Sequence, residues 1–229
     1  TLTHTTSPKT VNYKYRRKNV GDVLVHHYEA GTTTPLANDE NLSGVGKSGL
    51  TYTTTPKTIT DYELVVTPAN HTGTYPATGT TEVVYEYRRK NAGKVTVHHY
   101  LLGTTTELYT PAGKTSPSPE ELDGTGKLGL PYTTTDKTSD PALSNYELVT
   151  PAPTNATGTF QSGDQTVTYY YRRKNAGNIT VNHYEVGTTN ELFTPTGASS
   201  PSAVVIDGSG RLGQSENLNN EAANIANYE

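Results

Sequence analysis

The chain of 229 residues contains no cysteine, no methionine and no tryptophan, and it has only two phenylalanines. Without cysteine it forms no disulfide, no zinc–thiolate site and no thiol nucleophile. It also lacks a run of eighteen apolar residues and a signal peptide, so the sequence predicts no membrane contact in this fragment. The net charge of −4 gives no support for nucleic-acid binding. The missing cysteines thus exclude disulfide-stapled, zinc–thiolate and thiol-catalysed proteins.

Tyrosine and β-branched residues supply the apolar material that is present. Tyrosine outnumbers phenylalanine 17 to 2, and Thr, Tyr and Val favour strands. One predicted strand alternates as Val95, Val97 and His99, and another as Val167, Tyr169 and Tyr171; such alternation indicates half-buried strands. We therefore predict a mainly β fold, or an α+β fold if a short helix forms over "SPEELD" at 118–123, where Ser-Pro precedes two acids.

The sequence repeats itself. "YRRKN" begins at Tyr15, Tyr87 and Tyr171, which are 72 and 84 residues apart. This spacing predicts modules over 21–92 and 93–176 with different loop lengths, preceded at 1–20 by the end of another copy and followed at 177–229 by an incomplete one. We expect the chain to be a piece of a longer array. The segment 214–227 matches its counterparts poorly, so we expect the last module to be incomplete or loosely ordered. Because the joint "YRRKNAG" lacks a Pro-rich or Gly/Ser linker, the sequence predicts modules stacked end to end as an elongated rod.

A glycine-rich stretch, "LSGVGKSG" at 42–49, is similar to a phosphate-binding loop. Such a loop needs an earlier glycine, where this chain has Asn41, and a helix after it, where "LTYTTTPKT" predicts a strand. The copies "LDGTGKLG" and "IDGSGRLG" replace the hydroxyl of Ser48 by leucine. We therefore interpret the stretch as a repeated glycine turn and predict no cofactor.

Paired histidines raise the question of a metal site. Neighbours on a strand point to opposite faces, so His26 and His27 cannot chelate one ion. We predict instead that His27, His99 and His183 are buried and hydrogen-bonded. No Ser/His/Asp or paired-carboxylate set recurs, and the sequence predicts no catalytic, metal or cofactor site.

Each copy of "YRRKN" contains a basic triplet, Arg-Arg-Lys. The three triplets hold nine of the 18 lysines and arginines. One interpretation is a solvated strand end that balances local acids. The other is a basic belt that binds sulfate or sialate on glycans, or acidic strips of matrix proteins, with avidity from repetition. The candidate ligand-binding residues are Arg88, Arg89, Lys90, Arg172, Arg173 and Lys174.

The distributed pattern resembles the MucBP (mucin-binding protein) repeat of Gram-positive surface adhesins. The residues that carry the resemblance are Gly93, Val95, Val97, Tyr100, Gly129, Tyr132, Tyr146, Gly158, Phe160, Val167 and Tyr169. The alternation of 72 and 84 is similar to the two-module unit of streptococcal surface repeats.

The resemblance implies ubiquitin-like β-grasp modules in a non-enzymatic, extracellular protein, anchored to the cell wall through regions outside this fragment. The implied partners are host mucin, or the matrix proteins fibronectin and plasminogen. We expect a monomer. A stalk that only displays a distal adhesive domain is the alternative.

Overall fold

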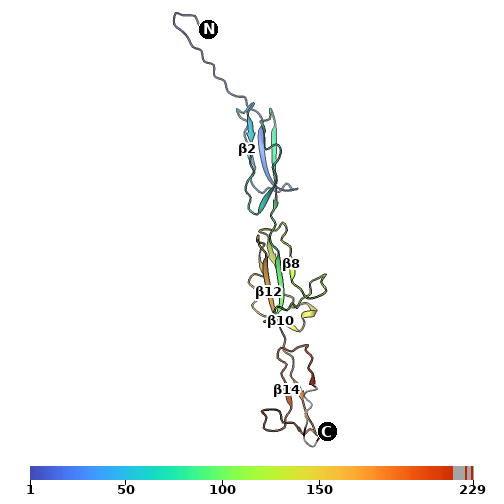
Figure 1. The fold of residues 1–229 in the computed structure, drawn as a ribbon. Coiled ribbons are helices and arrows are strands. Elements are labelled where there is room, and N and C mark those ends of the chain that lie inside the picture. Colours follow the sequence, from blue (N-terminus) through green and yellow to red (C-terminus); the bar gives the residue numbers. More distant parts are fainter. Residues whose placement is uncertain (219–224, 226–227, 229) are drawn as a thin grey trace. The chain divides into compact units, whose positions relative to one another are not determined.

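The computed structural model describes residues 1–218, 225 and 228 (Figure 1). By their contacts the residues form two compact units. The first is Thr1–Ala92 with Thr125–Gly129, and the second is Gly93–Gly124 with Leu130–Glu229. The expectation for segment 214–227 concerns mainly 219–224 and 226–227, which lie outside the described residues.

The first unit contains six strands. A four-stranded sheet has the order β2-β1-β6-β4, in which β1 and β6 are parallel and the two outer pairs are antiparallel. The remaining two strands, β3 and β5, form a separate antiparallel pair. The bounds are β1 Asp22–Glu29, β2 Glu40–Leu42, β3 Thr51–Thr53, β4 Tyr62–Val66, β5 Thr72–Thr74 and β6 Thr80–Arg89.

The core of this unit follows from the alternation in the two central strands. Val23 and Val25 of β1 and Val83 and Tyr85 of β6 are completely buried, and Tyr87 is 2% exposed. Because successive side chains of a strand point to opposite faces, a row of alternate apolar residues on each strand is sufficient to build one side of the core. The alternation predicted for the corresponding strands of the second unit is confirmed, because their alternate residues are all buried: Val95, Val97, His99, Val167, Tyr169 and Tyr171.

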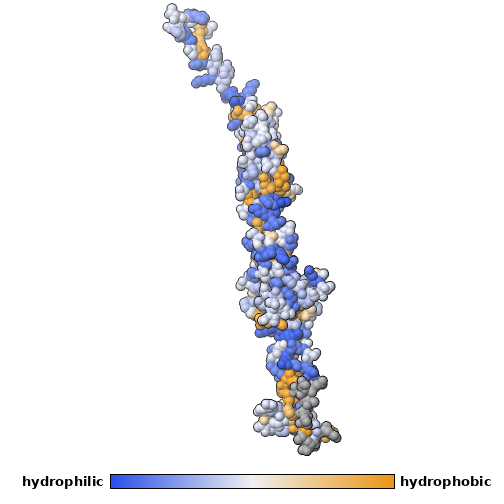
Figure 2. Space-filling view, viewed as in Figure 1, coloured by the Kyte–Doolittle hydropathy of each residue, from blue (hydrophilic) through white to orange (hydrophobic). Residues whose placement is uncertain are grey.

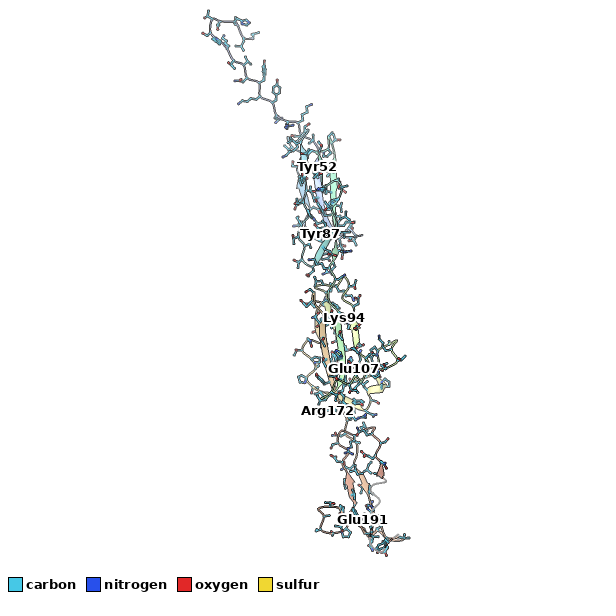
Figure 3. The ribbon with its side chains drawn as sticks, viewed as in Figure 1. Tyr52, Tyr87, Lys94, Glu107, Arg172 and Glu191 are labelled. Atoms are coloured by element: carbon cyan, nitrogen blue, oxygen red, sulfur yellow. The ribbon has the colours of Figure 1, made fainter. Side chains whose placement is uncertain are left out.

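The second unit repeats the arrangement. Its four-stranded sheet has the order β10-β12-β7-β8, with β7 and β12 parallel in the centre, and β9 pairs with β11. The side chains of both units are drawn in Figure 3, with Tyr52 and Tyr87 labelled in the first and Lys94, Glu107 and Arg172 in the second. The bounds are β7 Val95–Leu101, β8 Glu120–Leu122, β9 Pro131–Thr133, β10 Tyr146–Leu148, β11 Thr157–Thr159 and β12 Gln165–Arg173, with a 3-10 turn η1 at Pro141–Leu143.

The third copy is also assigned to the second unit, and its described residues form one strand pair. β13 (Ile179–Val181) pairs antiparallel with β14 (Val204–Ile206). Within the described residues no counterpart of β6 or β12 pairs with β13. Ile179 is accordingly 38% exposed, although its counterpart Val95 is completely buried.

The fold is therefore mainly β and made of small tandem sheet units, as predicted. A central parallel pair flanked by two antiparallel strands is the β-grasp sheet order. The short helix predicted over 118–123 is wrong, because Glu120–Leu122 is strand β8 and pairs with β7.

No helix in the described part of the chain is long and apolar enough to cross a membrane. On the face drawn in Figure 2, the hydrophobic residues form separate patches.

Candidate functional site

The arginine pairs stand at the ends of the two long closing strands, β6 and β12. Arg88 lies on the exposed side, and its Nε donates to Glu63 of β4 at 2.7 Å. Arg172 makes the same ion pair with Glu147 at 2.7 Å. Both arginine side chains remain well exposed, at 70% and 64%, so each ion pair contributes little to stability.

The second arginine of each pair is held by the protein. Arg89 is half-buried; its Nη1 donates to the carbonyl oxygen of Leu128 at 2.9 Å and its Nη2 to the Tyr62 hydroxyl at 2.9 Å. Its guanidinium also lies over the Tyr62 ring, 4.6 Å from the centre. A planar guanidinium can lie flat on an aromatic ring while its edge donates several hydrogen bonds in a fixed geometry, whereas the lysine ammonium is a compact point charge without such a planar fork. This arginine is therefore occupied by structural contacts.

The same contacts recur in the second unit. Arg173 Nη1 donates to the carbonyl oxygen of Leu212 at 3.0 Å, and its guanidinium lies 4.8 Å from the centre of the Tyr146 ring. The third basic residue is held through its backbone: the Lys90 N–H donates to the Asp61 carbonyl at 2.8 Å and the Lys174 N–H to the Asn145 carbonyl at 2.9 Å.

The glycine turns bind the asparagine that follows each basic triplet. The Gly126 N–H donates to Asn91 Oδ1 at 2.9 Å, and the Gly210 N–H donates to Asn175 Oδ1 at 2.9 Å. In the first copy the Gly46 N–H donates to Asn19 Oδ1 at 3.0 Å. Gly46 has φ +69, a conformation that glycine adopts without steric cost.

The glycine stretch is thus a docking turn for the strand end. Arg17 Nη1 donates to the Ser48 carbonyl at 2.9 Å, which repeats the contact of Arg89 with Leu128. A strand, β3, follows the turn rather than a helix. A phosphate loop uses free backbone amides at a helix N-terminus, and the Gly46 amide is already bonded to Asn19. The interpretation as a turn is confirmed.

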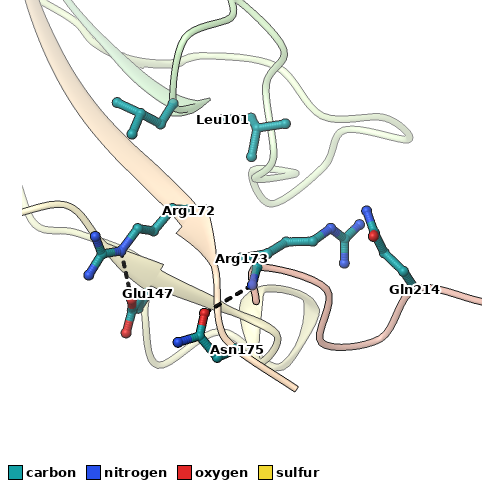
Figure 4. A pocket seen from close by; sticks show the side chains of 8 residues that line it. Leu101, Glu147, Arg172, Arg173, Asn175 and Gln214 are labelled. Atoms are coloured by element: carbon teal, nitrogen blue, oxygen red, sulfur yellow. Dashed lines mark hydrogen bonds and ion pairs between the residues drawn. The ribbon is translucent and has the colours of Figure 1, made fainter. Parts of the chain in front are cut away.

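A groove lies beside each docked turn, within a single unit in both cases. Groove 1 has a volume of about 510 Å³ and is lined by Glu29, Ala30, Tyr87, Arg88, Arg89, Asn91, Thr125 and Gly126. Groove 2 also has a volume of about 510 Å³ and is lined by Leu101, Leu102, Glu147, Arg172, Arg173, Asn175, Gly210 and Gln214 (Figure 4). The structure therefore brings both arginines of each triplet to one groove, whereas the lysines do not line it.

The histidines of the central strands form a separate, buried network. His27 and His99 are completely buried, and each Nδ1 lies 3.0 Å from a tyrosine hydroxyl, that of Tyr87 or Tyr171. In the second unit His99 Nε2 also lies 3.1 Å from Glu120. A neutral ring that donates from Nε2 to this carboxylate accepts at Nδ1, so Tyr171 donates to His99. The predicted burial of these two histidines is confirmed, whereas His183 is only partly buried.

Burial governs the ionisation of this network. It lowers the pKa of His27 and of His99, because the charged imidazolium is disfavoured away from water. Burial also raises the pKa of Tyr171 to about 12. Both rings are therefore neutral at pH 7. In the described part of the chain, no three His, Cys, Asp or Glu side chains lie close enough together to hold a metal ion.

Sequence reasoning did not identify the groove residues Asn91, Asn175, Leu101 and Leu102. The asparagine was visible as the last letter of the repeated "YRRKN". The leucines were visible as the point where "HHYLLG" departs from "HHYEAG". Their place beside the arginines depends on the parallel pairing of first and last strands, which the sequence alone does not specify.

Comparison with known proteins identifies the repeat. The model of the MucBP domain matches residues 22–88 and 94–172. Internalin J of Listeria monocytogenes serovar 1/2a is 37% identical over 173 residues, which are 74% of this chain and 18% of that protein. Internalin J of Listeria monocytogenes serotype 4b is 34% identical over 171 residues, which are 74% of this chain and 17% of that protein. The chain thus spans less than a fifth of the length of these relatives.

A solved structure of Streptococcal High Identity Repeats in Tandem (SHIRT) domains 3-4 from a cell surface protein is similar at 12% identity. The match covers 66% of this chain and 97% of that chain, with a TM-score of 0.29.

Proposed function

The chain belongs to the MucBP domain family, and we propose that it is a non-enzymatic adhesive segment of an extracellular, wall-anchored bacterial surface protein. Its ligands are the anionic groups of host mucin glycans or of matrix glycoproteins such as fibronectin and plasminogen. Single contacts are weak, and repetition of the module supplies avidity.

The recurrence of the arginine groove carries this proposal. Two grooves of equal volume are placed by equivalent residues of two copies, and each presents one well-exposed arginine. The ion pairs of Arg88 and Arg172 use Nε, and a guanidinium has further Nη donors that match an oxyanion. We therefore assign ligand binding to Arg88 and Arg172.

The other members of the basic triplets have a different role in this proposal. Arg89 and Arg173 hold the glycine turns, and Lys90 and Lys174 bind through their backbone amides to the preceding loop. These contacts favour a second function, a stalk whose joints are stabilised by the triplets and which binds nothing itself. The two functions differ in what they require of the exposed arginines.

The test is binding of the chain to immobilised mucin, fibronectin and plasminogen by surface plasmon resonance. The variant Arg88→Gln with Arg172→Gln should bind severalfold more weakly. The loss should be larger at low ionic strength, because screening limits charge interactions to about 10 Å at 0.1 M salt. The melting temperature should stay within a degree or two, since the ion pairs are exposed.

A matched control removes two positive charges elsewhere. Lys14 and Lys114 are exposed and do not line either groove, so Lys14→Gln with Lys114→Gln should bind as the unaltered chain does. Equal losses in both variants would indicate a nonspecific charge effect. Absence of binding to all three proteins would reject adhesion and favour the stalk.

A further inference from the structure

We propose that the two grooves are not equivalent. Groove 2 binds a sugar that bears an oxyanion, a carboxylate or a sulfate on a pyranose ring, and groove 1 binds the same ligand much more weakly. The proposal rests on the adhesive function above. It adds which copy binds, which residues discriminate and what chemistry they select.

The grooves differ at two positions that follow the first strand of each repeat. Groove 1 has Glu29 and Ala30, whereas groove 2 has Leu101 and Leu102. These positions correspond, because "HHYEAG" and "HHYLLG" occupy the same place in the two copies. Leu102 is 49% exposed, so groove 2 offers an accessible apolar surface where groove 1 offers a carboxylate.

The difference changes the charge that a ligand meets. In groove 2 the positive charges of Arg172 and Arg173 face one carboxylate, Glu147, which leaves one net positive charge. In groove 1 the corresponding Arg88 and Arg89 face two carboxylates, Glu29 in the lining and Glu63 in the ion pair, which leaves none. An anion is therefore attracted to groove 2 and meets no net attraction in groove 1.

The lining of groove 2 matches an acidic sugar in each of its parts. The Nη donors of Arg172 can take an oxyanion as a bidentate pair. The leucines can cover the apolar face of a pyranose ring. Asn175 accepts from Gly210 through its oxygen, so within the described part of the chain its amide donors remain for ring hydroxyls, as does the amide of Gln214 (Figure 4). A volume of about 510 Å³ lies in the ordinary range for small-ligand sites.

Nuclear magnetic resonance reads the two grooves in one experiment. Uniformly ¹⁵N-labelled chain is titrated with 3′-sialyllactose, with lactose 3′-sulfate and, as the neutral control, with lactose. Amide shifts at Leu101, Arg172 and Gln214 should move and saturate with a Kd on the order of millimolar, and those at Glu29 and Arg88 should move far less. Lactose should move neither set. Comparison of the Kd for 3′-sialyllactose with that for lactose 3′-sulfate decides whether the carboxylate or the sulfate is preferred.

Reciprocal exchange of the discriminating residues gives the decisive variants. Leu101→Glu should weaken binding at groove 2 about tenfold, the effect of losing roughly 1.4 kcal/mol. Glu29→Leu should strengthen binding at groove 1 by a similar factor. Both exchanges place in one copy the residue that the other copy already holds there, so both are expected to fold. Leu101→Gln separates the two causes, because it removes the apolar surface without adding charge.

Equal shifts in both grooves, or an unchanged Kd in Leu101→Glu, would overturn the inequivalence. Absence of shifts at groove 2 with both anionic sugars would overturn the ligand assignment. If the same chain still bound immobilised mucin through Arg88 and Arg172, adhesion would stand and only this inference would fail. If it bound neither the sugars nor the three host proteins, both proposals would fail together.

Discussion

Arg89 donates a hydrogen bond to the carbonyl oxygen of Leu128, which lies 39 residues further along the chain. Arg173 makes the equivalent bond with Leu212, at the same separation of 39 residues. Arg17 bonds Ser48 in the same way. The second arginine of each basic triplet is thus a structural residue, and this assigns different roles to two adjacent arginines.

The first prediction follows from that difference. Arg89→Ala loses two hydrogen bonds and the stacking on Tyr62, and should lower the free energy of unfolding by about 1–3 kcal/mol. Arg88→Ala loses only an exposed ion pair and should lower it by less than about 0.5 kcal/mol. Urea unfolding of the two variants measures the contrast. Equal losses would mean that the contacts of Arg89 with Leu128 and Tyr62 do not stabilise the fold.

The second prediction concerns the glycine turn. Gly46 has φ +69, and a Cβ at this position would meet nothing within 4 Å. Gly46→Ala should therefore cost about 1 kcal/mol of backbone strain without a steric clash, and Gly46→Asn should cost less, because asparagine tolerates this conformation. Thermal unfolding separates the two variants. A loss in Gly46→Asn as large as that in Gly46→Ala would contradict the conformational explanation.

Lys47 provides the matched test of the nucleotide interpretation. In a phosphate loop the corresponding lysine binds the phosphates, whereas in a docking turn its side chain is dispensable. Lys47→Ala should unfold within a degree or two of the unaltered chain. Isothermal titration calorimetry with ATP should show no heat of binding for either protein. Binding that Lys47→Ala abolishes would restore the nucleotide site.

The third prediction is a pH dependence of stability. The folded pKa of His27 and of His99 lies below the unfolded value of about 6.5, because burial disfavours the charged ring. The unfolded chain therefore binds more protons once the pH falls below about 6.5, and stability decreases there. Above about pH 7.5 this contribution is constant. The urea concentration at the midpoint of unfolding should therefore decrease as the pH is lowered from 7.5 to 5.

The three aspartates with a lowered pKa do not obscure this window. The pKa values of Asp22, Asp136 and Asp207 are lowered, chiefly by hydrogen bonds, so their contribution disappears only as the pH falls below about 3.9. Among the charged groups, Glu120 and Lys137 act most strongly on the pKa of His99, and Lys57 and Glu40 on that of His27. The variant His27→Gln should show a shallower dependence between pH 7.5 and 5. An unchanged slope would exclude His27 as the cause.

The fourth prediction concerns a buried hydroxyl pair. Thr54 Oγ1 donates to the His71 carbonyl and lies 2.8 Å from the Tyr85 hydroxyl, so Tyr85 donates to Thr54. Thr54→Val leaves the tyrosine hydroxyl without its acceptor and should cost about 1–3 kcal/mol. The double variant with Tyr85→Phe should cost less than the two single variants together, by about 1 kcal/mol. Strict additivity in urea unfolding would mean that the two hydroxyls are not coupled.

Local pattern was sufficient to predict much of this fold. Alternation along "VLVHHYE" placed His27 on the buried face, and the paired comparison of repeats placed the glycine turns in loops. The short helix over 118–123 was wrong because pairing along β7 outweighs a weak Ser-Pro signal: Leu122 stands directly opposite Val95. A three-residue edge strand carries no periodicity by which the sequence could reveal it.

The local sequence pattern did not predict which side chains contact each other from neighbouring strands of the sheet. Glu86 lies two residues from Arg88 on the same face of β6, yet the structure pairs Arg88 with Glu63. The reason is register: Glu63 stands directly opposite Arg88 on β4, and opposite residues are closer than residues two apart on one strand. The groove residues depend on the same long-range pairing, so the sequence identified the arginines without their surroundings.

The order of the strands has a mechanical consequence. In each complete sheet the first and last strands of the repeat are parallel neighbours, β1 with β6 over eight residues and β7 with β12 over seven. The chain therefore enters at one end of this pair and leaves at the other. Tension applied through the two ends would slide the parallel strands past each other and load all their interstrand hydrogen bonds in shear at once. An antiparallel hairpin pulled at its ends would instead break its hydrogen bonds one after another. Resistance to traction is thus a property of the topology itself, shared by the whole ladder rather than dependent on any single side chain.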